Sequence, residues 1–150
     1  MDLILWRHAE AEDGFPDEAR KLTAKGGKQA AKMAAWLKAR LPADSRILAS
    51  PTVRTRQTAA ALTEDYRLAE EVAPGASVAA VLAAAGWPDA EGTVVVVGHQ
   101  PTLGEVAAHL LADSRDSWSI KKGAVWWVGH RAHTGDGETV LKAVMSPELL

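Results

Sequence analysis

The sequence predicts an α/β domain in which helices cover both faces of a mostly parallel central sheet, with antiparallel strands at its C-terminal end. Two features of the chain indicate such a three-layer αβα sandwich. Short apolar runs of strand length alternate with segments of helical periodicity, as in parallel α/β sheets. Two apolar stretches near the end flank a glycine-rich turn, as in an antiparallel hairpin. Since 150 residues suit one domain and are few for two, we expect residues 1–150 to form a single domain.

The first third of the chain predicts a strand, a helix and a second strand. The apolar run 3–6 stops abruptly at charged residues, which indicates a short buried strand, and the polar residues 9–20 indicate a loop. Over residues 24–41 the apolar positions follow helical spacing, and Pro42 is expected to end that helix. Residues 46–49 form the second predicted strand.

The middle of the chain predicts a helix, a weak strand and another helix. Ser50 and Pro51 suit the N-cap and the first position of a helix that continues through residue 62. Residues 66–72 suggest a weak third strand. A helix over 79–85 is expected to close at Gly86.

The strongest strand signal is the run of β-branched residues over 93–97, which predicts a strand buried on both faces. A helix is expected after it, to about residue 112. The apolar stretches 125–128 and 139–144 flank Gly135-Asp136-Gly137, so the last strands are predicted to be antiparallel.

Composition and charge exclude several classes of function. With 47% hydrophobic and 24% charged residues the chain can bury a core, and disorder is not expected. The net charge of -2, with no basic block, does not suggest a nucleic-acid partner. The absence of cysteine excludes disulfides and thiolate chemistry, and the short apolar run at the start suits neither a signal peptide nor a membrane span. We therefore expect a cytoplasmic protein without a membrane partner.

Three predicted strand ends carry unusual polar residues, namely Arg7-His8, the segment from Ser50 to Arg54, and Gly98-His99. In open α/β sheets ligands bind at the carboxyl ends of the strands, so three such clusters point to one site. Arg54 would lie in the first turn of its helix, from which its guanidinium can reach back over the preceding strand end. The same helix start offers free backbone N–H groups to an anion.

Two arginines and two histidines around one cavity suit a doubly charged phosphoryl group. Arginine stays charged, binds phosphoryl oxygens through paired N–H groups and stabilises their charge during transfer. Neighbouring cations should lower the pKa of a histidine among them and leave its ring neutral. A neutral imidazole is a competent nucleophile, and a phosphohistidine intermediate would divide the reaction into two easier steps.

Four segments carry a resemblance to a known family. They are Leu5-Trp6-Arg7-His8-Ala9-Glu10, Leu22-Thr23-Ala24-Lys25-Gly26, Ser50-Pro51-Thr52-Val53-Arg54-Thr55-Arg56-Gln57-Thr58-Ala59 and Val97-Gly98-His99-Gln100-Pro101. In this order they resemble the histidine phosphatase superfamily, and most closely its short bacterial branch of SixA-type phosphohistidine phosphatases. The resemblance spans residues 3 to about 110, and the later part of the chain is compatible with it.

This resemblance implies a role for each polar residue at the strand ends. It identifies His8 as the nucleophile and Arg7, Arg54 and His99 as the phosphate-binding pocket, with Arg20 as a further cation near the substrate. It implies an enzyme without cofactor or metal that removes phosphate from phosphohistidine in a protein.

The general acid of the ester phosphatases in this superfamily has no evident counterpart. Those enzymes carry a carboxylate on a segment between the second and fourth motifs, whereas only 44 residues separate Arg54 from His99 here. Glu70 and Glu71 are candidates, and the sequence selects neither. A protonated imidazole leaves easily, so a missing acid matters less for a P–N bond than for an alkyl ester. This favours phosphohistidine over a sugar phosphate.

Other functions stay open at this stage. A phosphatase of small O-phosphate esters, such as sugar or nucleotide phosphates, would use the same residues. A phosphoprotein-binding module without turnover would need the cations but not the nucleophile, and the presence of His8 argues against it. The missing insertion disfavours a mutase, and a purely structural domain would leave the ordered motifs unexplained.

Several other polar residues have a simpler expected role. Arg56 lies on a different helix face from Arg54 and is expected to be solvated, whereas Gln57 and Thr58 could either pack or support the site. His109 is expected on the surface, because the apolar stripe of its predicted helix lies elsewhere.

The C-terminal part contains residues whose role the sequence leaves open. His130 and His133 have a spacing that could suit a metal but lack support from other ligands, so no metal is expected. Trp126 and Trp127 alternate along a strand, which predicts one ring in the core and one outside. The lysine pair 121–122 is expected to be solvated, or to meet an acidic or phosphorylated protein surface.

Overall fold

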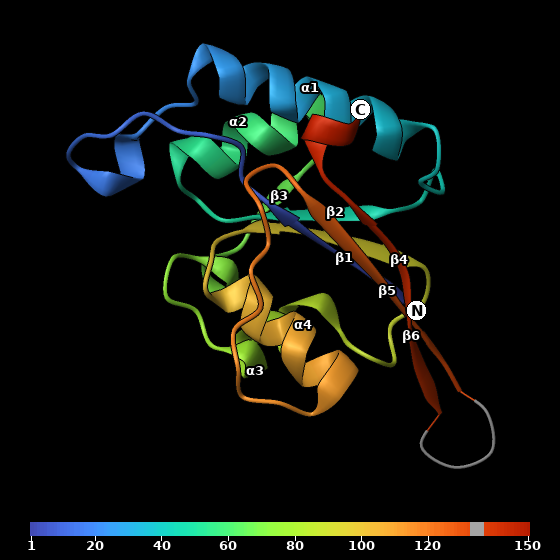
Figure 1. Ribbon diagram of the computed structural model, residues 1–150. Helices are drawn as coiled ribbons and strands as arrows, with labels where there is room; N and C mark the ends of the chain where they lie inside the picture. The colour runs from blue at the N-terminus through green and yellow to red at the C-terminus, as the bar shows by residue number, and fades with distance from the viewer. Residues whose placement is uncertain (133–136) are drawn as a thin grey trace.

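The computed structural model describes residues 1–132 and 137–150, and within them the strands form one six-stranded sheet (Figure 1). The strands are β1 (Asp2–Arg7), β2 (Arg46–Ala49), β3 (Arg67–Leu68), β4 (Thr93–Gly98), β5 (Val125–Arg131) and β6 (Glu138–Met145). They lie in the order β3-β2-β4-β1-β5-β6. The first four are parallel, whereas β5 and β6 run antiparallel to their neighbours. The predicted mostly parallel sheet with antiparallel C-terminal strands is confirmed.

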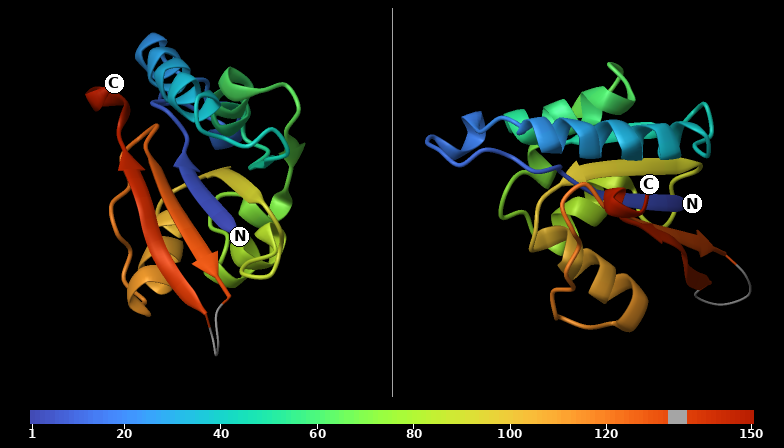
Figure 2. Two further views of the ribbon diagram at one scale, coloured as in Figure 1. Left: turned by 90° about the vertical axis from the view of Figure 1, so that its right-hand side faces the viewer. Right: turned by 45° about the horizontal axis from the view of Figure 1, so that its top comes forward.

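Helices cover both faces of this sheet, which confirms the three-layer arrangement (Figure 2). The helices are α1 (Ala24–Lys38), α2 (Val53–Leu62), α3 (Val78–Ala85) and α4 (Thr102–Ala112), with short 3-10 turns η1 (Asp17–Ala19), η2 (Glu70–Val72) and η3 (Pro147–Leu149). One face carries α1 and α2, and the other carries α3 and α4. Among the described residues, no helix combines the length and the apolar character that crossing a membrane requires.

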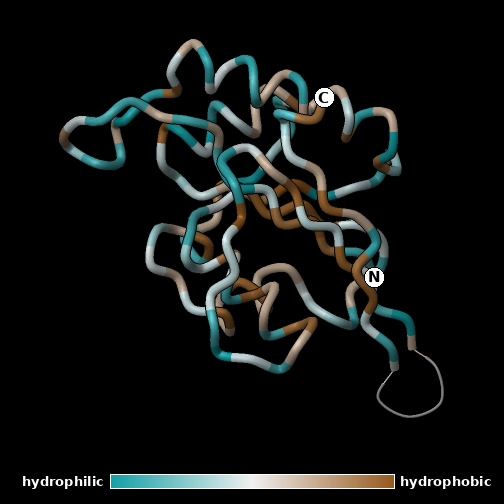
Figure 3. Tube along the Cα trace, in the orientation of Figure 1, coloured by the Kyte–Doolittle hydropathy of each residue, from teal (hydrophilic) through white to brown (hydrophobic). Residues whose placement is uncertain are grey.

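The side chains of strand β1 pack into two separate hydrophobic cores, one on each face of the sheet. Successive side chains of a strand point to opposite faces. Leu3 and Leu5 accordingly pack into the cluster beneath α3 and α4, while Ile4 and Trp6 pack into the cluster beneath α1 and α2. Its neighbour β4 is buried along its whole length, as its run of β-branched residues predicts. The apolar stretches of the trace meet between the helical layers in Figure 3.

The start of α2 differs from the prediction. Ser50 and Pro51 were expected to begin the helix, but it begins at Val53, and Thr52 is its N-cap, with its side chain accepting from the backbone N–H of Thr55. Both Ser50 and Thr52 are residue types that cap helices, so the choice between them depends on tertiary contacts. Arg54 still lies in the first turn, as the site prediction requires.

Two other elements are shorter than predicted. The helix expected over 24–41 ends at Lys38, and residues 39–41 form a turn before Pro42. The weak strand expected over 66–72 is reduced to β3, after which the chain turns into η2. The helix expected to close at Gly86 does so, with Gly86 in the left-handed conformation.

The C-terminal hairpin has the predicted antiparallel pairing, whereas residues 133–136 of its turn lie outside the described part of the chain. The expectation of one buried and one external tryptophan ring is wrong, because helices cover both faces of the sheet. Trp126 packs against the core beneath α3 and α4, and Trp127 packs against the core beneath α1 and α2. Both are half-buried, and the Trp127 indole N–H donates to the Asp2 carboxylate at 2.9 Å.

The loop between β1 and α1 is closed at its base. Ala11 and Leu22 form an antiparallel bridge, and the backbone N–H of Thr23 donates to the Glu10 carbonyl at 3.0 Å. Gly26 allows this contact with α1, since a Cβ at that position would lie 1.9 Å from the Glu10 carbonyl oxygen. The remainder of the loop projects beyond the carboxyl end of β1, at the left of Figure 1.

Candidate active site

The polar residues predicted at three strand ends line one pocket. Arg7 and His8 come from the end of β1, Arg54 from the first turn of α2, and His99 directly follows β4. The pocket has a volume of about 240 Å³, and Arg20 from the loop after β1 also lines it. The sheet order explains this convergence, because β4 lies between β1 and β2 and all three are parallel.

The His8 ring is held in one tautomer. It is 7% exposed, and its Nδ1 lies 2.7 Å from the carbonyl oxygen of Ala9. Since a carbonyl only accepts, Nδ1 must carry the proton, which leaves the lone pair of a neutral ring on Nε2. The Ala9 backbone is fixed in turn, because its N–H donates to the Thr58 hydroxyl at 3.1 Å.

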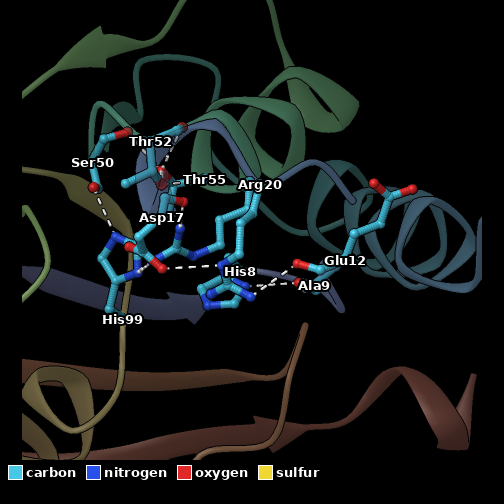
Figure 4. A network of polar contacts seen from close by, with 10 residues as sticks. His8, Ala9, Glu12, Asp17, Arg20, Ser50, Thr52, Thr55 and His99 are labelled. Carbon is cyan, nitrogen blue, oxygen red and sulfur yellow. Dashed lines mark hydrogen bonds and ion pairs between the residues drawn. The ribbon is translucent and has the colours of Figure 1, made fainter. Parts of the chain in front are cut away.

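His99 is fixed by a second set of contacts (Figure 4). Its Nε2 lies 2.8 Å from the Ser50 hydroxyl, and its Nδ1 lies 3.4 Å from the Arg54 guanidinium, which can only donate. His99 is therefore neutral, with Nδ1 accepting and Nε2–H donating to Ser50. The ring centroids of His8 and His99 are 5.3 Å apart.

Asp17 connects two of the cations in the pocket. Its carboxylate accepts from Arg54 Nη2 and from Arg20 Nε, each at 3.0 Å, and its backbone carbonyl accepts from Arg54 Nη1 at 2.9 Å. Burial acts to raise the pKa of Asp17, but the hydrogen bonds and charges of the two arginines outweigh it and hold that pKa below its usual value. Asp17 therefore stays ionised and orders both guanidinium groups.

Two guanidinium nitrogens in the site are buried without a partner. Arg7 Nη1 donates to the Ile120 carbonyl at 2.8 Å, but its Nε makes no hydrogen bond within the described residues, and the same holds for Arg54 Nε. Buried donors normally have an acceptor. The oxygens of a phosphoryl group bound in this pocket are acceptors of the required charge.

Both histidines of the pocket have strongly lowered pKa values. The pKa of His8 falls to about 4, mainly through burial, with the positive charges of Arg54 and Arg7 adding to the effect. The pKa of His99 falls to about 3, again mainly through burial, followed by the charge of Arg54. The predicted lowering of the histidine pKa is confirmed, but its main cause is burial away from water and not, as predicted, the neighbouring cations. At neutral pH both rings are uncharged.

These pKa values predict the acid limb of the pH profile. In the free protein, kcat/KM should stay level from pH 7 down to about 5 and fall below that with an apparent pKa near 4. A limb at the pKa of about 6.5 of a free imidazole would contradict the assigned environment.

The lowered histidine pKa values also predict that the folded protein loses stability as the pH falls. Below pH ~6.5 the unfolded chain binds protons that folded His8 and His99 do not, so the free energy of unfolding decreases as the pH falls toward 4. Equilibrium denaturation at several pH values measures this.

The structure also places the remaining candidates. Neither Glu70 nor Glu71 lines the pocket, and both are exposed, so the structure does not support either as the general acid. Among the described residues, the carboxylate that lines the pocket is Asp13, which the sequence did not single out. Lys122, expected to be solvated or to meet a protein surface, is exposed and lies at the pocket.

Supporting positions behave in different ways. Arg56 and His109 are exposed, as expected. Thr58 holds the Ala9 backbone, and Gln57 accepts from the Leu22 backbone N–H at 2.8 Å, so both support the loop after β1.

Only His130 of the two hairpin histidines lies within the described residues. His130 lies against the Trp87 ring and 3.0 Å from the Thr139 hydroxyl, whereas His133 lies outside the described residues. In the part of the chain that the structure describes, no group of three or more metal-ligating side chains comes together.

Comparison with known sequences places the chain in a family. The profile of the histidine phosphatase superfamily (branch 1) matches residues 3–77. An uncharacterised protein of Mycobacterium tuberculosis is 35% identical over 115 residues, covering 72% of this chain and 71% of that protein. The phosphohistidine phosphatase SixA of Escherichia coli is 31% identical over 119 residues, covering 73% of this chain and 74% of SixA.

Solved structures agree with this placement. The protein histidine phosphatase SixA complexed with tungstate superposes with a TM-score of 0.79 at 26% identity, over 99% of both chains. A phosphoserine phosphatase mutant of Entamoeba histolytica shares the fold, with a TM-score of 0.72 at 19% identity, over 99% of this chain and 98% of that one. The family profile, the curated relatives and the matching fold together show that the chain belongs to the histidine phosphatase superfamily.

Proposed function

We propose that the chain is a phosphatase that uses His8 as its nucleophile and removes phosphate from phosphohistidine in proteins. The observation that carries this proposal is the state of His8. Its ring is buried, neutral and fixed by Ala9, so that the lone pair on Nε2 is available in a pocket lined by three arginines. A nucleophile in a cationic pocket is the combination that phosphoryl transfer requires.

The reaction divides into two displacements at phosphorus. In the first, His8 Nε2 attacks the phosphorus atom, the bond from phosphorus to the substrate imidazole breaks, and that imidazole leaves with the proton it carries. In the second, water attacks the phosphohistidine at His8, the P–N bond breaks, and inorganic phosphate is released while the ring regains its lone pair. Arg7 and Arg54 neutralise the phosphoryl oxygens in both steps.

Apart from Asp13, which lines the pocket and is tested below, the carboxylates near the pocket favour a P–N substrate. Asp17 is held ionised by Arg54 and Arg20, so it has no proton to give to a leaving group. Glu70 and Glu71 do not line the pocket. An imidazole that is already protonated needs no acid, whereas an alkoxide needs a proton as the P–O bond breaks.

The relatives support the same substrate class. The E. coli protein that is 31% identical is named a phosphohistidine phosphatase, and the SixA structure contains tungstate, an oxyanion that resembles phosphate. The phosphoserine phosphatase at 19% identity shares only the fold, so it does not favour an ester substrate.

A substrate panel tests the proposal, with Asp13 as the specific alternative. Phosphate release from a phosphohistidine-bearing protein, from free phosphohistidine and from p-nitrophenyl phosphate and a sugar phosphate would be compared. We expect kcat/KM for the P–N substrates to exceed that for the sugar phosphate by at least about 100-fold, the scale of one general-acid contribution.

The Asp13→Asn variant distinguishes the two phosphatase functions. Asp13 lines the pocket and could protonate a leaving alkoxide. If the wild type prefers the sugar phosphate and Asp13→Asn loses that activity selectively, the chain is an O-ester phosphatase. If the wild type prefers the P–N substrates and Asp13→Asn leaves their hydrolysis unchanged, the proposed substrate class stands.

A further inference from the structure

The size of the pocket restricts where the rest of the substrate can lie. At about 240 Å³ it is smaller than the 300–1,000 Å³ typical of sites that enclose a small molecule, and arginine and histidine side chains dominate its lining. It can hold a phosphoryl group and the ring attached to it. Whatever carries that ring must therefore rest on the rim.

The most prominent part of the rim is the loop over residues 11–22. Asp13 and Arg20 of this loop line the pocket, and Asp17 is bonded to Arg54 inside it. The loop is also tied at its base by the backbone hydrogen bond from Glu12 to Lys21 at 2.7 Å. It therefore presents a fixed surface beside the phosphoryl site, and it projects from the body of the molecule (Figures 1 and 2).

Phe15 is the exposed apolar residue of that surface. It is the single phenylalanine of the chain, and it is 98% exposed, whereas the other large hydrophobic residues exposed in the described structure range from 40% to 74%. It stands two residues from Asp13 and two from Asp17, so at most about 7 Å of chain separates it from each of these site residues. Isolated apolar residues are common on protein surfaces. An aromatic ring with almost no intramolecular contact, at the tip of an ordered loop beside the site, requires a more specific explanation.

We propose that Phe15 is the anchor by which the protein part of the substrate docks, packing on an apolar patch next to the phosphohistidine. This inference rests on the proposed function and names what selects its substrates. Aromatic side chains are the residues that most often dominate protein interfaces, especially where polar groups surround them. Here Arg20 and Lys122, which both line the pocket, supply polar surroundings.

The occupant follows from the position of Phe15 beside the phosphoryl site. A phosphohistidine seated against His8 places its own backbone and neighbouring side chains at the rim, within reach of Phe15. A free phosphorylated metabolite would fill the pocket and make no contact with that ring. Phe15 therefore selects for phosphohistidine on a protein surface with aliphatic neighbours.

The test is a cycle of changes on both partners. The enzymes are wild type, Phe15→Ser, Phe15→Leu and Leu141→Ser. Leu141 is a matched control, since it is 46% exposed but pairs with Val128 opposite Leu3, at the far end of β1. The substrates are free phosphohistidine, a helical peptide with leucines one turn from its phosphohistidine, and the same peptide with serines in their place.

We expect Phe15→Ser to lower kcat/KM on the leucine peptide about tenfold, through KM, which corresponds to about 1.4 kcal/mol. Turnover of free phosphohistidine and of the serine peptide should stay within about twofold, since these substrates offer Phe15 nothing apolar to pack on. Phe15→Leu should restore most of the loss, and Leu141→Ser should cause none. Thermal unfolding of Phe15→Ser should match that of the wild type, because the ring is exposed.

Two outcomes would overturn the inference. An equal loss on all three substrates would make Phe15 a structural residue, and no loss on the leucine peptide would remove it from substrate binding. A change in oligomeric state without a change in substrate preference would assign Phe15 to self-association instead. Failure of the proposed function would give a different result: the wild type would not turn over free phosphohistidine but would hydrolyse a sugar phosphate.

Discussion

Replacing His8 with alanine should abolish turnover of every substrate, with kcat falling by about 10⁴-fold or more, as when a covalent nucleophile is removed from other enzymes. The loss should be the same for P–N and P–O substrates, because both reactions begin with attack by Nε2. Single-turnover phosphate release measures the effect. In the wild type, a reaction with labelled substrate quenched in alkali should leave the label on His8, and the variant should carry none.

The His8→Ala variant should still bind an oxyanion, which separates loss of chemistry from loss of the pocket. Arg7, Arg54 and Arg20 remain in place in this variant. Calorimetric titration with tungstate should therefore give a dissociation constant within about tenfold of the wild type. Full activity of His8→Ala would refute the nucleophile assignment, and a wild type that binds phosphoprotein without turnover would make the domain a binding module.

Replacing Arg54 with alanine should lower kcat by about 10²–10³-fold, the range found when one main electrostatic contact to a transition state is removed. The side chain is 4% exposed and contacts both Asp17 and His99. Its removal deprives the phosphoryl oxygens of a cation and leaves the Asp17 carboxylate without its buried partner. Steady-state kinetics with tungstate as a competitive inhibitor would show both a lower kcat and weaker inhibition.

Two further variants make the Arg54 result specific. Arg54→Lys keeps the charge but not the paired N–H groups, so its kcat should lie between those of the wild type and Arg54→Ala. Arg56→Ala changes an exposed arginine two residues away, and its kinetics should equal those of the wild type. If Arg56→Ala were as harmful as Arg54→Ala, the effect would come from the helix rather than from the pocket.

The positions of the site residues could be predicted because they depend on strand order and little else. Arg7, His8 and His99 lie at or directly after short apolar runs that predict buried strands, and parallel strands bring their carboxyl ends to one edge. Arg54 was predicted for a related reason, since a residue in the first helical turn points back over the preceding strand. These local patterns survive small errors in element boundaries.

Features that depend on tertiary contacts could not be predicted. Serine is a preferred N-cap residue, but in the fold the Ser50 hydroxyl lies against His99, and Thr52 caps the helix. Asp17 gave no periodic signal in a polar loop, and only its spacing of three residues from Arg20 could have indicated an ion pair. Burial, the main cause of the lowered histidine pKa values, was missed for the same reason, because it depends on the folded pocket and not on residues adjacent in the sequence.

The closed base of the loop after β1 makes its tip replaceable. The bridge between Ala11 and Leu22 and the approach of Gly26 to Glu10 hold both ends of the loop against α1, close to His8. Insertions or deletions within residues 13–16 lie beyond the backbone hydrogen bond from Glu12 to Lys21 and need not move those ends, so the position of the nucleophile does not depend on them. The tip of the loop can therefore be replaced during evolution, which would change which substrates bind without moving the catalytic residues. An engineered recognition segment could be inserted at the same position.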